Sequence, residues 1–360
     1  MSVNHLLTLP RPETSAAAKA EQTKLLEKHK AQDKQLLIES RVFAEEKRFT
    51  SWWHLLSTLA ALLVCGGVAA FGGMVWVRCL GCLMTGLIIV RLFILYHDFQ
   101  HNAIFKDSFI AKMILNTYGY ILLTPPSVWK RSHDYHHKNN SKLFGASIGS
   151  FPIMTLETYR DASKSERFEY QLSRNPLIIV FGYFFVFLYG MCIRPLIVDS
   201  RRHWDAYLAL AFHFGFIVAC FLLGGWMTAL FVFILPSLIA CATGAYLFYI
   251  QHNFPGAQIN DCDEWTYTGA ALQSSSFMEM GPVMHWLTGN IGYHHVHHLN
   301  SKIPFYRLPE AMRALKPLQS PCRTSWKIKD IVGCLSLKLW DVNQKCFVSF
   351  RAARRNKDES

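Results

Sequence analysis

Three stretches of the chain are apolar almost without interruption, and each is long enough to cross a membrane. They run from Trp52 to Val77, from Cys79 to Tyr96 and from Ala206 to Ile250, with Gly224-Gly225 near the middle of the last. A bilayer core about 30 Å thick is crossed by about 20 apolar residues in a helix. The pattern therefore predicts four membrane-spanning helices in two hairpins. Buried helices of a soluble protein seldom stay apolar on every face over such lengths.

Two shorter apolar stretches differ from these. Phe109 to Thr124 contains Lys112 and Asn116, which leaves its membrane placement open. Pro176 to Val198 is interrupted by glycine, arginine and proline, and both of its flanks carry Lys or Arg. Because positive residues mark the cytoplasmic side of a membrane, we expect this second stretch to dip into the membrane and return, or to lie in the interface. That leaves four spans, with both termini in the cytoplasm.

Composition agrees with a membrane protein. Of the 360 residues, 51% are apolar and 17% are charged, which excludes a disordered chain. The net charge of +12 raises nucleic acid as a partner, but residues after Asn300 carry 13 Lys or Arg against 5 Asp or Glu. This distribution favours a basic cytoplasmic tail that attracts anionic lipid, and no nucleic acid.

The charge pattern also predicts the domain organisation. The first 50 residues mix both signs of charge and lack the apolar core of a signal peptide. We expect residues 15–49 to form an amphipathic cytoplasmic helix, or a solvated tail. The predicted units are an N-terminal cytoplasmic extension (1–50), a membrane domain (51–315) and a basic cytoplasmic tail (316–360).

The histidines are the most unusual feature, because most of the 16 fall into three clusters. These are His97-Asp-Phe-Gln-His101, His133-Asp-Tyr-His136-His137 and His294-His295-Val-His297-His298. Positions three or four apart share one face of a helix, so each cluster can aim imidazoles at one point. Neutral imidazole binds Zn, Cu, Fe and Ni. The candidate ligands are His97, His101, His133, His136, His137, His294, His297 and His298, with His252 as a ninth. Nine nitrogens exceed what one tetrahedral ion takes, so two metal ions are predicted.

Other histidines fit ordinary structural roles. We expect His5, His29, His54, His203 and His213 to be satisfied core or interface residues, and His285 to lie either beside a ligand or at an interface. A metal transporter would carry ionisable residues at mid-membrane depth. Here the clusters lie near the ends of the apolar stretches, which argues against a transporter.

Three histidine clusters separated by paired apolar stretches resemble the membrane fatty acid desaturase family, over roughly residues 50 to 315. YHDFQHNAIF is similar to the first histidine box of that family, SHDYHHKNNS to the second, and GYHHVHHLNSKIPFYRLPEA to the third. YLFYIQHNFPGA, ahead of a loop that contains Trp265, resembles the acyl-lipid, delta-12-like branch.

The resemblance implies an all-α integral membrane protein with four transmembrane helices, interfacial helices and a cytoplasmic cap that carries a histidine-ligated di-iron site. It implies two Fe²⁺ ions on the nine histidines named above, with Asp98 and Asp134 orienting imidazoles and His295 not ligating. The implied activity introduces a cis double bond into an acyl chain of a membrane lipid, using O2 and external electrons. The acyl chain would lie in a bent tunnel between the spans.

Three further expectations follow from the resemblance. In the animal stearoyl branch an Asn stands four residues before the outlying His, whereas Phe248 stands there in this chain. Any water-mediated ligand would then come from Asn253 or Gln251. No dinucleotide-binding or fused cytochrome b5 motif is present, which implies an external ferredoxin or cytochrome b5 that docks on the basic face. His294 stands where front-end desaturases carry Gln, which argues against that branch.

The alternative activity is that of a related histidine-box hydroxylase or ketolase acting on a lipid or carotenoid. The continuation of the third box into LNSKIPFYRLPEA favours the desaturase. We expect a bacterial inner membrane with the site on the cytoplasmic face, and the endoplasmic reticulum as the alternative location.

Overall fold

The computed structural model describes residues 31–143, 150–261 and 264–355, and these are mostly helical. Two long antiparallel helices, α2 (Arg48–Phe71) and α3 (Val75–Gln100), form the first hairpin. A second long helical run comprises α10 (Asp205–Thr228), the π-helical η3 (Ala229–Ile234) and α11 (Leu235–Ile250). Arg48–Phe71, Val75–Gln100 and Asp205–Ile250 are long and apolar enough to cross a membrane.

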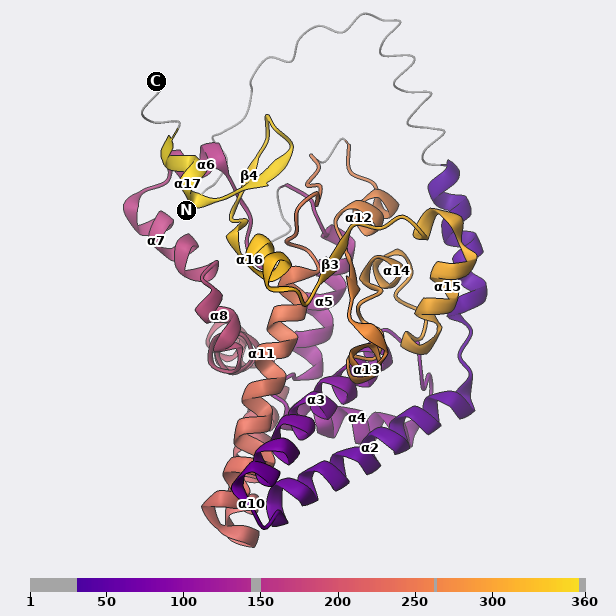
Figure 1. Ribbon diagram of the computed structural model, residues 1–360, viewed down its shortest axis with the longest axis vertical. Coiled ribbons are helices and arrows are strands. Elements are labelled where there is room, and N and C mark those ends of the chain that lie inside the picture. Colours follow the sequence, from indigo (N-terminus) through magenta and orange to yellow (C-terminus); the bar gives the residue numbers. More distant parts are fainter. Residues whose placement is uncertain (1–30, 144–149, 262–263, 356–360) are drawn as a thin grey trace, which may run out of the picture.

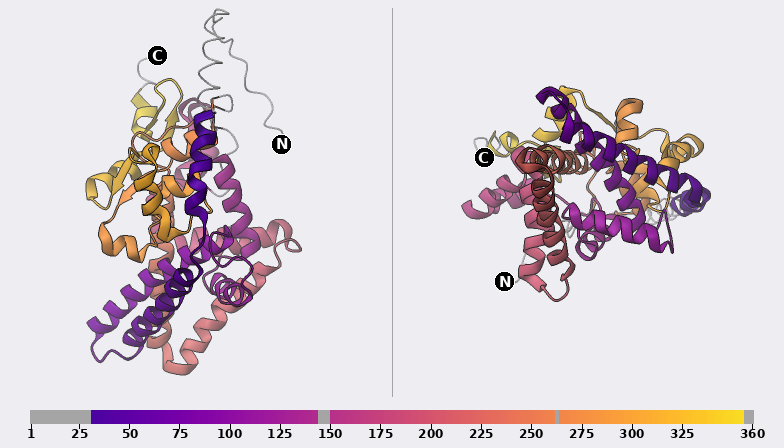
Figure 2. Two further views of the ribbon diagram at one scale, coloured as in Figure 1. Left: turned by 90° about the vertical axis from the view of Figure 1, so that its right-hand side faces the viewer. Right: turned by 90° about the horizontal axis from the view of Figure 1, so that it is seen from below.

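The Asp205–Ile250 run is itself a hairpin. Gly224 and Gly225 leave the helical conformation, and Gly225 has a φ of +73°, which glycine adopts at little cost. After this break the chain returns, so that α10 packs against η3. The turns of both hairpins lie at the same end of the molecule (Figures 1 and 2). The glycine pair thus breaks the apolar stretch near the position that the sequence predicts.

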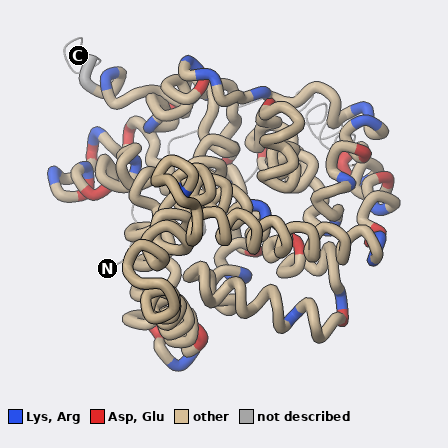
Figure 3. Tube along the Cα trace, turned by 60° about the horizontal axis from the view of Figure 1, so that its bottom comes forward, with Lys and Arg blue, Asp and Glu red and all other residues tan. Residues whose placement is uncertain are grey.

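The outer surface of the hairpins is apolar. Charged residues are nearly absent from these helices and gather on the rest of the chain (Figure 3). Phe71, Leu222 and Leu223 are more than 70% exposed, at 85%, 75% and 88%. Water does not stabilise an apolar surface of this extent, whereas lipid chains do.

Several shorter helical segments connect the two hairpins. They include α4 (Phe109–Ile121) and α5 (Pro126–Asn139), then α8 (Pro176–Val180), the π-helical η2 (Tyr183–Ile193) and α9 (Arg194–Asp199). Figure 2 shows the run from η2 to α9 crossing the direction of the hairpins. Pro176–Val198 is divided between α8 and the contiguous η2–α9 run, and its expected dip into the membrane or placement in the interface stays a prediction.

A cap of short elements covers the end of the bundle opposite the hairpin turns (Figure 1). Its helical elements are η1 (Arg41–Ala44), α6 (Leu156–Asp161), α7 (Lys164–Ser173), α12 (Tyr267–Gln273), α13 (Gly281–Leu287), α14 (His294–Leu299), η4 (Phe305–Arg307), α15 (Leu308–Ala314), η5 (Lys316–Leu318), α16 (Ile328–Ser336) and α17 (Phe350–Arg355). Residues 31–40 are also helical, and the remainder of the helix expected over residues 15–49 lies partly outside the described residues.

Two small sheets hold the cap together, so the chain is mostly helical rather than all-helical. One has the strand order β1-β4-β5, where β1 (Met154–Thr155) is parallel to β4 (Leu339–Asp341) and β4 is antiparallel to β5 (Cys346–Val348). The other pairs β2 (Phe277–Glu279) with β3 (Arg323–Ser325) in parallel. These strands are too short for an alternating pattern to reveal them in the sequence. Through them, residues beyond 316 pair with earlier parts of the chain.

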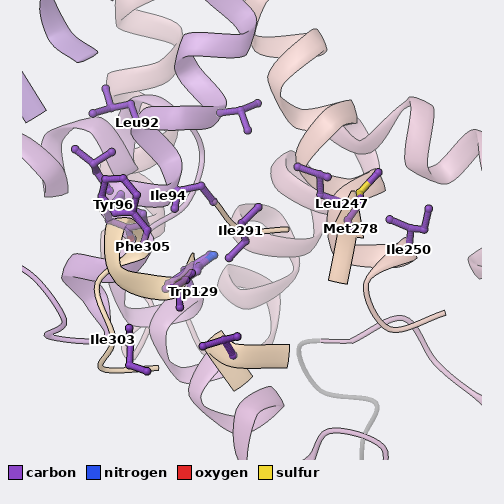
Figure 4. Close-up of a cluster of buried hydrophobic side chains, with 14 of the residues drawn as sticks. Leu92, Ile94, Tyr96, Trp129, Leu247, Ile250, Met278, Ile291, Ile303 and Phe305 are labelled. Atoms are coloured by element: carbon purple, nitrogen blue, oxygen red, sulfur yellow. The ribbon is translucent and has the colours of Figure 1, made fainter. Parts of the chain in front are cut away.

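The main hydrophobic core lies where the cap meets α3, α5 and α11 (Figure 4). Leu92, Tyr96, Trp129, Leu247 and Phe305 are all at most 6% exposed. Because they come from four separate elements, α3, α5, α11 and η4, their packing fixes the relative positions of the helices that carry the histidine clusters.

Candidate metal centre

Nine histidines from four parts of the chain meet in two groups. His97 and His101 lie at the end of α3, and three more lie on α5. His252 follows the end of α11, and the last three lie on α14. Within each group the potential ligand atoms lie within 4.8 Å of one another. The five-histidine group consists of His97, His101, His133, His137 and His297, and the four-histidine group of His136, His252, His294 and His298.

The five-histidine group is wholly buried. The Nε2 atom of His97 lies 3.0 Å from that of His133, which lies 3.1 Å from that of His137. The Nε2 atom of His137 in turn lies 3.0 Å from that of His297. The Nε2 atom of His101 is buried and has no hydrogen-bond partner. The ring nitrogens of this group therefore face one another rather than surrounding donors.

The four-histidine group repeats the arrangement on the other side of α5 and α14. The Nε2 atoms of His136 and His252 are 3.0 Å apart, those of His252 and His294 are 2.9 Å apart, and those of His294 and His298 are 3.1 Å apart. His252 is the one member of this group that is only partly buried. His136 and His137 belong to different groups, and so do His297 and His298, because consecutive residues of a helix point about 100° apart.

These contacts fit metal ions better than hydrogen bonds. A neutral imidazole has one N–H, so a chain of four facing nitrogens cannot be satisfied by its own protons. Burial lowers the pKa of His101, His133, His137 and His297, and that of His252 to about 4, so the rings are neutral and their lone pairs are available. Around an ion about 2.1 Å from each nitrogen, neighbouring nitrogens lie about 3.0–3.4 Å apart, close to the observed spacing.

Several rings are held from behind through Nδ1. His97 donates through Nδ1 to Asp98 Oδ1 at 2.9 Å, and Asp98 Oδ2 accepts from the Phe305 backbone N–H at 2.6 Å. His252 donates through Nδ1 to the Ser274 carbonyl at 2.9 Å. Each of these bonds fixes the tautomer that leaves Nε2 free to bind a metal.

Asp98 and Asp134 differ in how closely they approach a histidine. Asp98 is buried and holds His97 directly. Asp134 Oδ1 is 3.9 Å from His101 Nδ1, while its Oδ2 pairs with Lys130 Nζ at 3.0 Å. The Asp134 side chain is 38% exposed, so its contact with the ring is looser.

Two residues that contact the histidine groups, Trp129 and Ser150, were not predicted from the sequence. Trp129 stacks on His133 with ring centroids 4.5 Å apart. Ser150 Oγ lies 2.6 Å from His136 Nδ1. Only spacing within the same helix could have suggested the contact of Trp129, and the contact of Ser150 depends on how two separate segments fold together.

The remaining histidines lie outside both groups. His295 donates to the Leu318 carbonyl at 3.0 Å, and His285 packs against the rings of Phe277 and Tyr293. His54, His203 and His213 have ordinary partners, as expected of structural histidines. His5 and His29 lie outside the described residues.

Neither amide side chain suggested as a further ligand faces a histidine group. Gln251 donates to the Ile291 carbonyl at 2.9 Å. Asn253 accepts from Arg174 and donates to the Cys334 carbonyl at 2.6 Å. These bonds engage both amides with other parts of the chain, and a water-mediated role for Asn253 or Gln251 stays a prediction.

Comparisons with known proteins agree with this site. The profile of the fatty acid desaturase family matches residues 74–326. A fatty acid desaturase of Bacillus subtilis is 35% identical over 268 residues, which are 74% of this chain and 75% of that protein. An sn-1 acyl-lipid omega-3 desaturase (ferredoxin) of Nostoc is 25% identical over 66% of each chain. An sn-1 oleoyl-lipid 12-desaturase of Synechocystis is 23% identical over 77% of this chain and 79% of its own.

Proposed function

Because this chain belongs to the fatty acid desaturase family and is a desaturase, an oxidoreductase, we propose that it forms a cis double bond in an acyl chain of a membrane lipid. We further propose that two iron ions serve this reaction, one on each histidine group. The observation that carries this proposal is the meeting of nine imidazoles, eight of them buried, in two groups whose nitrogens face inward. When bound, the iron pair would supply O2-dependent removal of two hydrogens from adjacent methylene carbons.

The residues around the ions have separate tasks. Burial of the rings keeps them neutral and keeps water away from the site. Asp98 orients the His97 ring through a direct hydrogen bond and is itself anchored by the backbone at Phe305. Ser274 holds the His252 ring by accepting from Nδ1 through its carbonyl. These bonds keep the ligand nitrogens in position whether or not substrate is bound.

We propose that α2, α3, α10 and the η3–α11 run form four membrane spans, with the cap in the cytoplasm. The shared end of the two hairpin turns supports this arrangement, since the histidine groups then lie just outside the bilayer (Figure 1). The basic character of the chain after Asn300 supports a cytoplasmic cap. The bacterial inner membrane is the proposed location.

The proposed substrate is an acyl lipid and the proposed electron donor is a ferredoxin or cytochrome b5. Relatives named as acyl-lipid desaturases support the first, and the Nostoc relative named with ferredoxin supports the second. Such donors are usually acidic, and the excess of Lys and Arg over Asp and Glu in this chain suits them electrostatically.

Lipid analysis of a bacterial host that makes only saturated fatty acids tests this function. Expression of the full chain is expected to yield cis-unsaturated acyl chains in the membrane lipids, located by mass spectrometry. New hydroxyl or keto groups in place of double bonds would identify a related oxygenase and overturn the proposal. Protease protection of the C-terminus in sealed inside-out vesicles tests topology, because a protected tail would contradict a cytoplasmic cap.

A further inference from the structure

A buried arginine, Arg174, lies where α7, α11 and α16 end. It contacts Asn253, which is the residue after His252 of the four-histidine group. Arg174 follows α7, is 2% exposed and donates to Asn253 Oδ1 at 2.5 Å. It also donates to the carbonyl of Leu337, at the end of α16, at 3.1 Å. Its Nε is buried without a partner. Asn253 directly follows His252 in sequence, so the guanidinium lies beside the metal centre.

Positive charge accumulates at this point without a counterion. Lys338 is 8% exposed and its Nζ donates to the Arg174 carbonyl at 2.5 Å. Within the described part of the chain, neither side chain forms an ion pair, and both lie over the ring of Tyr249. Burial and the neighbouring Arg174 lower the pKa of Lys338 to about 8. A buried charge without a partner is costly, so an anion bound here would be stabilised.

The same arginine lines a cavity of about 210 Å³ with two kinds of wall. Its polar walls include Arg174 and Lys142, and its aromatic walls include Phe151 and Phe248. His252 also lines the cavity, and Phe248 lies against the rings of His136 and His252, at 5.0 and 5.7 Å between centroids. The lining therefore offers the cation of Arg174 to an anionic group and apolar surface to a hydrocarbon chain. The Lys142 ammonium donates to Asn139 Oδ1 at 3.0 Å and lies 4.2 Å from the Trp265 ring centroid, so it would turn from that ring to reach the anion. Its size is that of a headgroup rather than of a whole lipid.

The helices that end at Arg174 carry apolar side chains on their outer surfaces. On α7 these are Phe168 and Leu172, 66% and 48% exposed, and on α16 they are Ile328 and Val332, 79% and 59% exposed. In each helix the two residues are four apart, so they share one face. Such faces are typical of helices that lie in a membrane interface. A lipid is therefore a better source of the anion than a free ion in solution.

We propose that this cavity binds the phosphate of a membrane phospholipid, with Arg174 as the main contact and Lys142 as the second, and so brings an acyl chain of that lipid to the four-histidine group. The proposal rests on the proposed desaturase function and narrows its substrate to phosphate-bearing lipids.

Binding of two short-chain lipids to the full-length, iron-loaded protein in detergent tests this site. The probes are dihexanoyl phosphatidylglycerol and dihexanoylglycerol, which share their acyl chains and differ in the phosphate headgroup. The wild type is expected to bind the phosphatidylglycerol at least about tenfold more tightly. Arg174→Gln is expected to weaken this binding about 10- to 100-fold and Lys142→Gln less, while Arg174→Lys keeps part of it. Arg201→Gln, at an exposed position outside the cavity, serves as the matched control.

Three results would overturn the proposal. Equal binding of the two lipids by the wild type would show that the phosphate is not recognised. Unchanged phosphatidylglycerol binding in a folded Lys142→Gln or Arg174→Gln variant would place any phosphate elsewhere. Inorganic phosphate that binds as tightly as the lipid would identify a site for a free anion. The assay needs no electron donor, so normal desaturation without lipid-phosphate binding would refute this site alone, whereas intact binding in a protein that never desaturates would refute the proposed function.

Discussion

The two histidine groups use the same side chain for the same purpose, yet they differ in how they are enclosed. The five-histidine group is fully buried and is supported by Asp98 and by the ring of Trp129. The four-histidine group has one histidine fewer, includes the partly buried His252 and borders a cavity. A metal ion with fewer protein ligands and an adjacent cavity has room for other molecules, as in catalytic metal sites generally. The difference suggests that small molecules reach the centre from the four-histidine side.

Removal of a ligand from either group is expected to have the largest effect. His297→Ala in the five-histidine group and His136→Ala in the four-histidine group should each lower unsaturation more than about 100-fold, because each would remove a proposed metal ligand rather than a supporting contact. The measurement is the fatty-acid profile of an expressing host, with membrane fractionation to show that each variant still inserts. Normal activity in either inserted variant would refute the assignment of two metal ions.

Substitution of His252 is expected to affect the four-histidine group while leaving the five-histidine group intact. His252→Ala leaves three histidines in the four-histidine group and five in the other. Three protein ligands can still hold an ion, so we expect activity to fall about 10- to 100-fold and iron to be lost from the smaller group first. Iron content per chain after dialysis against a chelator checks this. Equal loss from the same treatment of His295→Ala, which removes a buried histidine outside both groups, would show that the effect is structural.

Substitution of Asp98 is expected to have a larger effect than substitution of Asp134, because Asp98 lies closer to its histidine. Asp98→Asn replaces the charged acceptor of His97 and should lower iron affinity or activity about 10- to 100-fold. Asp134→Asn, where the carboxylate is 3.9 Å from His101, should cost only a few-fold. Parallel measurement of turnover and iron retention compares the two variants. An Asp134→Asn enzyme that is more impaired than Asp98→Asn would contradict the described support of the five-histidine group.

Substitution of His295, which belongs to neither histidine group, is expected to have the smallest effect on activity and iron content. His295→Ala removes a hydrogen bond to the Leu318 carbonyl and should lower stability by about 1 kcal/mol, with two iron ions and most activity retained. Thermal unfolding together with iron content tests this. An inactive, iron-depleted His295→Ala protein would mean that the ligand positions are displaced by one residue.

Sequence spacing predicted the eight clustered histidines, and the resemblance added His252, but neither could divide the nine into two groups. Positions three or four apart on a helix necessarily share a face, so His133 and His137 had to point the same way. Which group His136 joins depends on where α14 and the chain after α11 lie relative to α5, and that is decided by long-range packing. The partition into five and four therefore required the three-dimensional structure.

The fold shows the same boundary between local and long-range information. The apolar stretches and the Gly224-Gly225 pair predicted the hairpins because length and glycine conformation are local properties. The paired strands β2 and β3 join segments 46 residues apart, and Arg174 contacts Asn253 and Lys338, which are 79 and 164 residues away in sequence. Short contacts of this kind leave no periodic pattern in the sequence.

The most direct test of two unlike metal sites is the iron content of the purified full-length protein, combined with Mössbauer spectroscopy of the protein loaded with ⁵⁷Fe. Nine histidines in groups of five and four predict about two iron ions per chain, in distinct environments because their nitrogen ligands differ in number. A single iron ion per chain, or a protein that is fully active with another metal and no iron, would contradict the account.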